Sequence, residues 1–296
     1  MNDTAKKTFA GYVRFIENEL EKYSLTGKTG LQDNVAKAMD YSLEAGGKRI
    51  RPVLVLAFCN MCGGDYKKAA APAAAIEMIH TFSLIHDDLP CMDDDDFRRG
   101  KPSCHKQFDE ATAVLAGDAL AIRPFEIIAK SAELSDTAKI RIIAELANSS
   151  GAEGMIGGQI IDIENEKRNV VDEENLHTMY LLKTGKLIKT SCVMGCIAAG
   201  ADDEKIKYAE KYAECLGMAF QVIDDILDVT GNEQLLGKPV GSDAEENKTT
   251  FVTIFGIEKA REEAEKYTKQ AMDILDKFDN NEFLKELTEY MLNRNY

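Results

Sequence analysis

Apolar residues recur at helical spacing along most of the chain, and the alternation typical of β-strands is rare. A first stripe consists of residues three or four positions apart, which lie on one face of a helix: Phe9, Tyr12, Val13, Ile16 and Leu20. A second amphipathic stripe begins with Val53, Leu54, Ala57 and Phe58. The pattern therefore predicts helices from end to end.

Turn-forming residues interrupt this pattern, but no linker does. We expect loops at Gly63-Gly64-Asp65, Gly231-Asn232 and Lys238-Pro239. A chain of 296 residues could hold two domains. Because the periodicity is continuous, we expect residues 1–296 to form one domain, an all-α fold built as a single large helical bundle.

Two aspartate clusters stand out because their surroundings are apolar. The first runs Asp87-Asp88-Leu89-Pro90-Cys91-Met92-Asp93. In the second, i, i+3, i+4, i+7 spacing places four side chains on one helix face: Gln221, Asp224, Asp225 and Asp228. Grouped carboxylates repel one another and are costly to desolvate, so each cluster should remain solvated or bind cations. Ligands that are all oxygen favour Mg²⁺ over Zn²⁺, and Mg²⁺ commonly shares its ligands with a substrate phosphate. The substrate implied is a diphosphate.

Two other interpretations would give the first cluster no catalytic role. Asp93 to Asp96 could be a solvated run of charge, but an apolar approach precedes it and a cationic block, Arg98-Arg99-Gly100-Lys101-Pro102, follows it. A calcium loop would need a glycine at its sixth position and a glutamate at its twelfth, and the sequence has neither.

The spacing of the first cluster predicts a break in its helix. Asp87 and Asp93 are six residues apart, which on a continuous helix would separate them by about 120°. Pro90 cannot donate to the helical ladder and favours a break. We therefore expect the helix to deform or end near Leu89, so that Asp93 folds back toward Asp87.

A third motif supplies positive charge, Gly46-Gly47-Lys48-Arg49-Ile50-Arg51-Pro52. Glycines let backbone amides approach an anion, and a following helix would add its positive N-terminal end. On its own the motif is weak, since basic residues at helix starts are common. In a chain of formal net charge -15, it indicates a second anion, such as another diphosphate.

These motifs together resemble the trans-isoprenyl diphosphate synthases. Asp87 to Ser103, DDLPCMDDDDFRRGKPS, is similar to the longer form of that family's first aspartate-rich motif, and Asp224 to Asp228 to the second. GGKRIRP resembles its isopentenyl diphosphate site. Further similar segments follow in family order: Ile79-His80, Gly117 to Leu120, Gly157-Gly158-Gln159, Lys183-Thr184-Gly185, and Gly237 to Asp243 with Lys248. The resemblance implies the isoprenoid synthase bundle, with a central active-site cavity.

The resemblance also implies residue roles. Asp87, Asp93 and Asp224 would hold about three Mg²⁺ ions, with Mn²⁺ as an alternative, around an allylic diphosphate. Asp88 and Asp228 would support them, and Asp225 belongs to the same catalytic set. The allylic diphosphate and its pocket would be contacted by Arg98, Lys183, Lys238, Lys248, Thr184 and Gln221. Isopentenyl diphosphate would be bound by Lys48, Arg51, His80 and Arg99.

Chain length is expected to depend on the residues that precede the first cluster. Phe82 and Ser83 lie five and four residues before Asp87, so Phe82 sits about 7.5 Å along the helix from the metals. An aromatic residue beside a serine there resembles bacterial farnesyl diphosphate synthases, which stop at C15. A C20 geranylgeranyl diphosphate synthase is the alternative, and Phe82 as a plain core residue suits both.

Two other classes remain as alternatives. A silent binding subunit usually loses an aspartate motif, and both are present here. A terpene cyclase has no use for GGKRIRP or a second DDxxD, because it binds no second diphosphate. The residues leave open whether His86 supports Asp87 or only packs, and the role of His105. Ser242 stands where many relatives have lysine, and Arg294 in the tail is a further candidate for contact with a diphosphate.

Composition sets the expected surroundings of the protein. We expect a cytoplasmic protein without stable membrane insertion, because no apolar run approaches about 18 residues and the N-terminus lacks a signal-peptide core. Its acidity argues against nucleic-acid binding. The 7 cysteines show no complete zinc pattern and are expected to be free thiols. The resemblance implies a homodimer.

Overall fold

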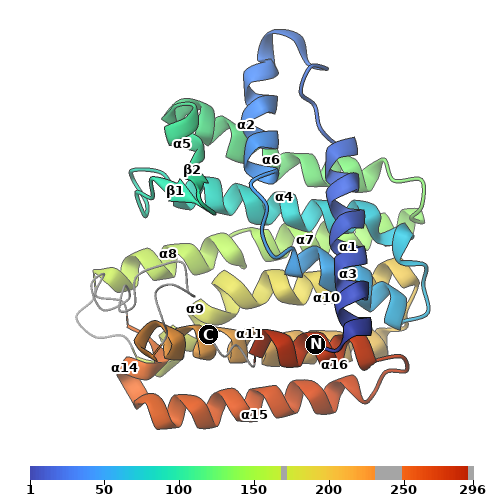
Figure 1. Cartoon of the computed structure of the whole chain (residues 1–296), viewed down its shortest axis with the longest axis vertical. Coiled ribbons are helices and arrows are strands. Elements are labelled where there is room, and N and C mark those ends of the chain that lie inside the picture. Colours follow the sequence, from blue (N-terminus) through green and yellow to red (C-terminus); the bar gives the residue numbers. More distant parts are fainter. Residues whose placement is uncertain (168–171, 231–248, 293–296) are drawn as a thin grey trace.

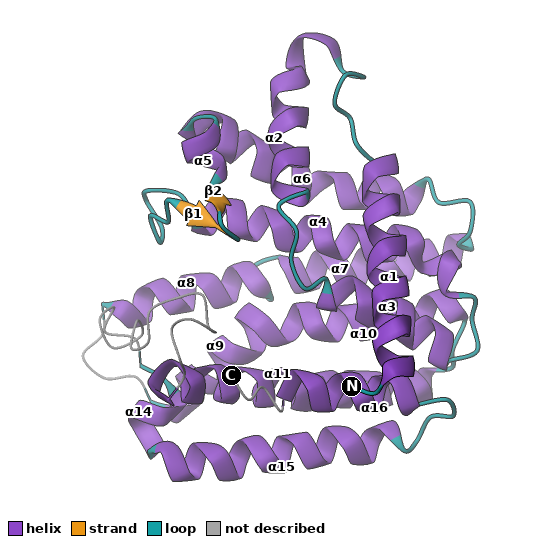
Figure 2. Ribbon diagram, in the orientation of Figure 1, coloured by secondary structure: helices purple, strands orange, loops and turns teal. Residues whose placement is uncertain are grey.

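The computed structural model describes residues 1–167, 172–230 and 249–292, and these are predominantly helical (Figures 1 and 2). The N-terminal half contains α1 (Asp3–Lys22), η1 (Gly30–Gln32), α2 (Asp33–Leu43), α3 (Ile50–Met61), η2 (Tyr66–Ala69), α4 (Ala70–Asp87), β1 (Phe97–Arg98), β2 (Lys101–Pro102), α5 (Cys104–Gln107) and α6 (Glu110–Ala129). The C-terminal half contains α7 (Asp136–Ser150), α8 (Met155–Glu166), α9 (Glu173–Tyr180), η3 (Leu181–Gly185), α10 (Lys186–Ala199), α11 (Asp203–Thr230), α14 (Phe251–Phe255), α15 (Ile257–Leu275) and α16 (Glu282–Leu292). The predicted all-α class is confirmed.

The core lies where α3, α4, α10 and α11 pack against one another and against an outer set that includes α6 and α15 (Figure 1). The stripe predicted on α1 is confirmed, since Tyr12, Ile16 and Leu20 are buried. The residues of the stripe predicted from Val53 are buried as expected, but the helix that carries them is not amphipathic. Nearly every residue of α3 from Pro52 to Met61 is buried, because neighbouring helices surround it.

The start of the chain contacts the last described helix, α16. Asn2 donates to the Glu286 carboxylate of α16 through its backbone N and its Nδ2, at 2.8 and 3.0 Å. One hydrophobic cluster contains residues from α1 through α16. The prediction of one domain over residues 1–296 stays a prediction.

The loop predicted at Gly63-Gly64-Asp65 is confirmed between α3 and η2. The other two predicted breaks lie outside the described residues. A short antiparallel pair, β1 with β2, was not predicted, because two residues per strand are too few to show an alternation (Figure 2). It positions Arg98 and Arg99 after the first aspartate cluster.

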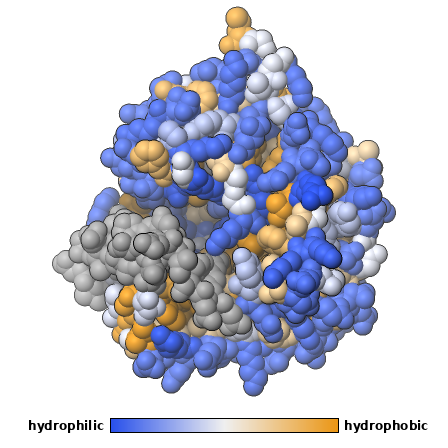
Figure 3. Space-filling view, in the orientation of Figure 1, coloured by the Kyte–Doolittle hydropathy of each residue, from blue (hydrophilic) through white to orange (hydrophobic). Residues whose placement is uncertain are grey.

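The face of the molecule in Figure 3 is mostly hydrophilic, with small apolar patches. In the described parts of the chain, no helix combines the length and the apolar character that crossing a membrane requires.

Candidate active site

A cavity of about 570 Å³ lies among α4, α6, α8 and η3. Its polar lining residues include Arg51, His80, Ser83, His86, Asp87, Gln159, Lys183 and Thr184. Its apolar wall includes Phe82, Val114, Met155, Ile156, Ile160 and Leu187. Charged groups of both signs therefore share a cavity with a long apolar wall, as an amphiphilic substrate would require.

The first aspartate cluster begins where α4 ends. The helix stops at Asp87, and the backbone N of Asp93 donates to the Asp87 carbonyl at 2.9 Å. The predicted break near Leu89 is thus confirmed. Its physical cause is Pro90, which disfavours helical backbone at the residue before it and has no N–H to donate.

The surroundings of Asp87 disfavour its ionised form. Burial raises its pKa to about 6; the Asp93 and Asp88 carboxylates add to the rise, and Lys183 and Arg98 oppose it. Ionised Asp87 thus lies near a second carboxylate in a poorly solvated place. A divalent cation would relieve both costs, so the residues present fit the Mg²⁺ site predicted for Asp87 and Asp93.

Asp88 forms an ion pair with Arg98. Its side chain is 3% exposed, and Arg98 Nε donates to its Oδ1 at 2.8 Å. Arg98 also contacts Asp95 at 2.9 Å. Arg98 is paired with Asp88 and Asp95. Its predicted contact with a diphosphate would therefore either add to its ion pair with Asp88 or replace it.

The predicted basic site is assembled from three segments. Arg51 from α3 lies 3.4 Å from His80 Nε2 on α4, and Arg99 from the β1–β2 turn donates to the Gly46 carbonyl. Burial, and then Arg51 and Arg99, lower the pKa of His80 well below its usual value. The Nε of Arg51 is buried without a hydrogen-bond partner. This concentration of positive charge is suited to an anion.

Gly47 allows this assembly. Its φ is +125°, and an added Cβ would lie 2.6 Å from Arg99 Cζ. Any side chain there would displace the guanidinium. Lys48, the next residue of the same loop, is exposed.

The sequence did not distinguish Arg49 from its neighbours. Arg49 is 4% exposed and points into the bundle, where it donates to Glu77 at 2.7 Å and to the Leu43 carbonyl at 2.6 Å. Its role is therefore to hold the loop. The available signal was Glu77, a lone acid in an apolar helical run, which needs a buried cation as partner.

Lys183 and Thr184 lie in η3, a π-helical turn between α9 and α10. Such turns are frequent at functional sites. Lys183 Nζ pairs with the Asp162 carboxylate of α8, a partner that the sequence analysis missed. Gly158 lets α8 approach, because an added Cβ would lie 2.2 Å from the Lys183 backbone N.

The second aspartate cluster lies near the end of α11, and its members differ in burial. Asp225 and Asp228 are 5% and 2% exposed, whereas Gln221 and Asp224 are half-buried. Asp225 accepts from Tyr180 Oη at 2.6 Å and from the Phe251 backbone N at 2.7 Å. Asp225 therefore fastens α11 to α9 and α14, and its catalytic role stays a prediction.

Asp87 and Lys183 line the cavity, as do Arg51 and His80; Asp93 lies close enough to Asp87, and Arg99 close enough to His80, to shift the pKa of each. The α11 aspartates are not among the residues that line the cavity, so a metal site shared by Asp87 and Asp224 stays a prediction. Predictions for Lys238, Ser242, Lys248 and Arg294 fall outside the described residues. His86 packs against α6, with Nε2 3.1 Å from the Val114 carbonyl.

Known proteins share this architecture. The family model described as polyprenyl synthetase matches residues 32–291. The heterodimeric geranylgeranyl pyrophosphate synthase large subunit 1 of Arabidopsis thaliana is 47% identical over 92% of this chain and 75% of that protein. The farnesyl diphosphate synthase of Bacillus subtilis is 45% identical over 88% of each chain.

Solved structures agree. The structure of an FPP/GFPP synthase from Zymomonas mobilis has a TM-score of 0.88 and 35% identity, and the match covers 99% of this chain and 100% of that one. A geranylgeranyl pyrophosphate synthetase from Geoglobus acetivorans has a TM-score of 0.87 and 30% identity, covering 99% and 100%. The resemblance inferred from the motifs is thereby confirmed, and this chain belongs to the polyprenyl synthetase family as a short-chain trans-prenyltransferase.

Proposed function

We propose that the protein condenses isopentenyl diphosphate with dimethylallyl or geranyl diphosphate, head to tail, and releases farnesyl diphosphate (C15) as its main product. The observation that carries this proposal is the division of charge in and beside one cavity. An acidic pair beside Lys183 and a separate basic cluster around Arg51 suit two different diphosphates.

The acidic side would hold the allylic diphosphate. Asp87 and Asp93, with Asp224 from α11, would bind the Mg²⁺ ions on which this family depends. Bound there, Mg²⁺ offsets the negative charge that develops on the leaving diphosphate. Lys183 would leave Asp162 to contact the same diphosphate, and Thr184 lies beside it on the cavity wall.

The basic side would hold isopentenyl diphosphate. Arg51 and Arg99 supply charge, and Lys48 reaches the site from its rim. Because the pKa of His80 is low, its imidazole stays neutral at pH 7 and orients an oxygen by hydrogen bonding alone.

Bond changes follow from this placement. The allylic C–O bond breaks, and its electron pair leaves with the diphosphate. The double bond of isopentenyl diphosphate attacks the allylic cation, and the proton then lost passes to the departing diphosphate. The apolar wall, which includes Leu187 and Ile160, excludes the water that would otherwise capture the cation.

The C15 assignment depends on Phe82. Its side chain lies on the cavity wall and is 5% exposed, and its ring meets the His86 ring edge-on with centroids 5.8 Å apart. His86 in turn lies so close to Gly117 that an added Cβ would be 2.1 Å from Nε2. His86 and α6 therefore hold the Phe82 ring in place beside the growing prenyl chain. The relatives include both farnesyl and geranylgeranyl diphosphate synthases, so C20 is the competing assignment.

Product analysis tests the proposal. The protein is incubated with Mg²⁺, isopentenyl diphosphate and either dimethylallyl or geranyl diphosphate, and the dephosphorylated products are sized by chromatography. Farnesol as the main product is expected. Geranylgeraniol would contradict the chain length, and a cyclic hydrocarbon or unconsumed isopentenyl diphosphate would contradict the reaction.

A further inference from the structure

His105 on α5 is a buried histidine with an unused ring nitrogen. Its side chain is 7% exposed, and Nδ1 lies 3.1 Å from Ser103 Oγ. The other nitrogen, Nε2, is buried with no hydrogen-bond partner. A buried polar atom of this kind is costly unless something binds to it.

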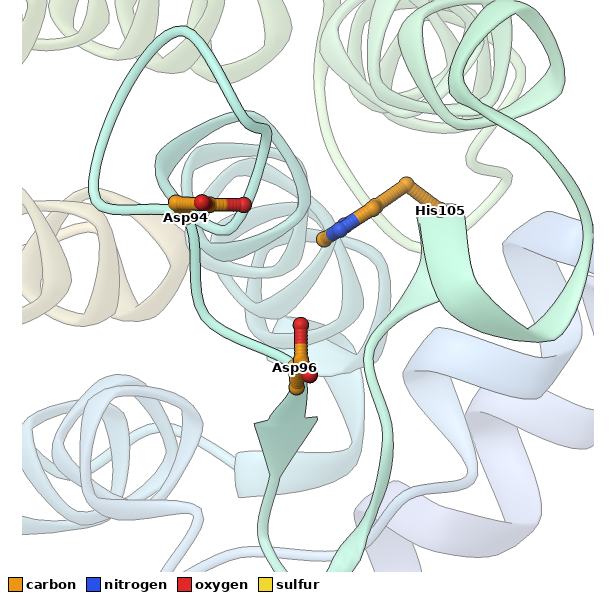
Figure 4. Close-up of side chains that lie close together, drawn as sticks. All are labelled: Asp94, Asp96 and His105. Atoms are coloured by element: carbon orange, nitrogen blue, oxygen red, sulfur yellow. The ribbon is translucent and has the colours of Figure 1, made fainter.

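Two carboxylates face this imidazole. One oxygen each of Asp94 and Asp96 and a ring nitrogen of His105 all lie within 4.8 Å of one another. Figure 4 shows the His105 ring directed toward the space between the two aspartates. Asp94 and Asp96 are exposed, so their side chains can rotate, while His105 is fixed by burial.

The backbone holds this arrangement in place. The Asp94 N donates to the Leu89 carbonyl at 3.2 Å, and the Ser103 N donates to the Asp96 carbonyl at 2.9 Å. Asp94 has a φ of +53°, a left-handed conformation that aspartate and asparagine tolerate better than most residues. The loop and α5 therefore face each other through paired backbone contacts.

We propose that Asp94, Asp96 and His105 form a binding site for a divalent transition-metal ion, Zn²⁺ by preference, separate from the Mg²⁺ of the reaction. Zn²⁺ binds imidazole nitrogen and carboxylate oxygen at about 2.0–2.2 Å, so small rotations of the two aspartates bring all three ligands onto one ion. Mg²⁺ prefers oxygen ligands alone. Ser103 Oγ would accept from Nδ1–H, the outer hydrogen bond that orients a metal-binding histidine.

Lys106 occupies part of this site in the structure. Its Nζ lies 2.7 Å from Asp96 Oδ1, and the two side chains are 43% and 61% exposed. An exposed pair of this kind contributes little stability. A doubly charged ion bound to three ligands would displace the ammonium group.

The site would stiffen the loop that carries a predicted catalytic ligand. Asp93 directly precedes Asp94, and its backbone N donates to the Asp87 carbonyl. An ion that fixes Asp94 and Asp96 against α5 would therefore hold Asp93 near Asp87 before substrate arrives.

Histidine NMR tests the proposal independently of turnover. The protein has 4 histidines, so ¹⁵N-histidine labelling gives few signals, and His105→Gln assigns the one of interest. ZnCl₂ is added in the presence of excess MgCl₂. We expect the His105 ring signals to shift and saturate at one equivalent, and Asp94→Asn, which suits the same backbone conformation, to weaken Zn²⁺ binding on the order of 10-fold or more.

Asp95→Asn is the matched control. It removes the same charge from the same loop, but Asp95 pairs with Arg98 at 2.9 Å and lies outside the cluster. Zn²⁺ should therefore bind to it as to the unaltered protein. The proposal is overturned if the His105 signals do not respond to Zn²⁺, as when the ion goes to thiols, or if Asp94→Asn binds Zn²⁺ as tightly as Asp95→Asn does.

Discussion

At the scale of single residues, Asp87 shows a conflict between stability and function. Because its pKa is raised to about 6 by burial, its ionised form is disfavoured in the folded state. Its stabilising contribution is complete below its unfolded pKa of about 4 and is lost as pH rises through about 6. At pH 7 the metal-free protein therefore carries an unfavourable charge that the reaction needs.

Asp87→Asn should accordingly stabilise the metal-free protein while it disables the enzyme. We expect the free energy of unfolding to rise by roughly 1–2 kcal/mol at pH 7 and to change little near pH 4. Turnover should fall on the order of 10²-fold or more. Urea unfolding at both pH values and steady-state kinetics measure the two effects, with Asp136→Asn, a 95% exposed acid, as control. A variant that is less stable at pH 7 would refute this account of Asp87.

Phe82→Ala should lengthen the product, because truncation removes the ring from the cavity wall. The main product should shift from C15 toward C20 or longer, as read by chromatography of the dephosphorylated alcohols. Phe97→Ala removes a ring that is 69% exposed on β1 and should leave the product unchanged. An unaltered C15 product from Phe82→Ala would remove Phe82 from this role.

Residue types and spacing singled out the aspartates as candidates, but they could not assign the arginines. Arg49 and Arg51 are two positions apart in one basic motif, yet Arg49 pairs with buried Glu77 and Arg51 lies beside His80. The difference arises because Arg49 has a left-handed backbone, with a φ of +50°, which redirects its side chain into the bundle. No local pattern encodes that turn.

At the scale of elements, the contact between α8 and η3 positions Lys183. Gly158→Ala would place a methyl group 2.2 Å from the Lys183 N and 2.6 Å from its Cα, so the π-helical turn must move. We expect the KM for the allylic diphosphate to rise about 10-fold or more and kcat to fall, since small displacements of positioning groups are costly. Gly11→Ala on α1 meets no atom within 4 Å and should leave both constants unchanged. Equal kinetics in the two variants would contradict this role for the contact.

Element boundaries were predictable where a single residue sets them, as Pro90 does for the end of α4. They were not predictable where packing decides. The π-helical form of η3 has no signature in Lys183-Thr184-Gly185, and the burial of α3 on all sides depends on helices far away in sequence, among them α10.

At the scale of the whole molecule, α6 presents apolar residues to solvent. Leu115 and Ile122 are 54% and 69% exposed and lie seven residues apart, on one face of the helix. We propose that this face joins two copies of the chain. Light scattering should then give twice the 32.8 kDa monomer mass, and Ile122→Glu should shift the protein toward monomer. A monomeric unaltered protein would rule the homodimer out.

The helical class was predictable for the whole molecule because it follows from periodicity repeated in every segment. Candidate site residues could be named from the sequence, but their arrangement could not. Asp162 and Tyr180 became visible only once distant helices were brought together, since each acts by binding a predicted residue.

Calorimetric titration can show whether acids from α4 and α11 jointly hold one diphosphate through metal ions. An unreactive thiolo analogue of geranyl diphosphate is titrated into the unaltered protein, Asp87→Asn and Asp224→Asn, with and without Mg²⁺. We expect tight binding only for the unaltered protein with Mg²⁺, and binding weakened at least about 10-fold in each variant. Equal affinity without Mg²⁺, or an Asp224→Asn variant that binds as tightly as the unaltered protein, would contradict it.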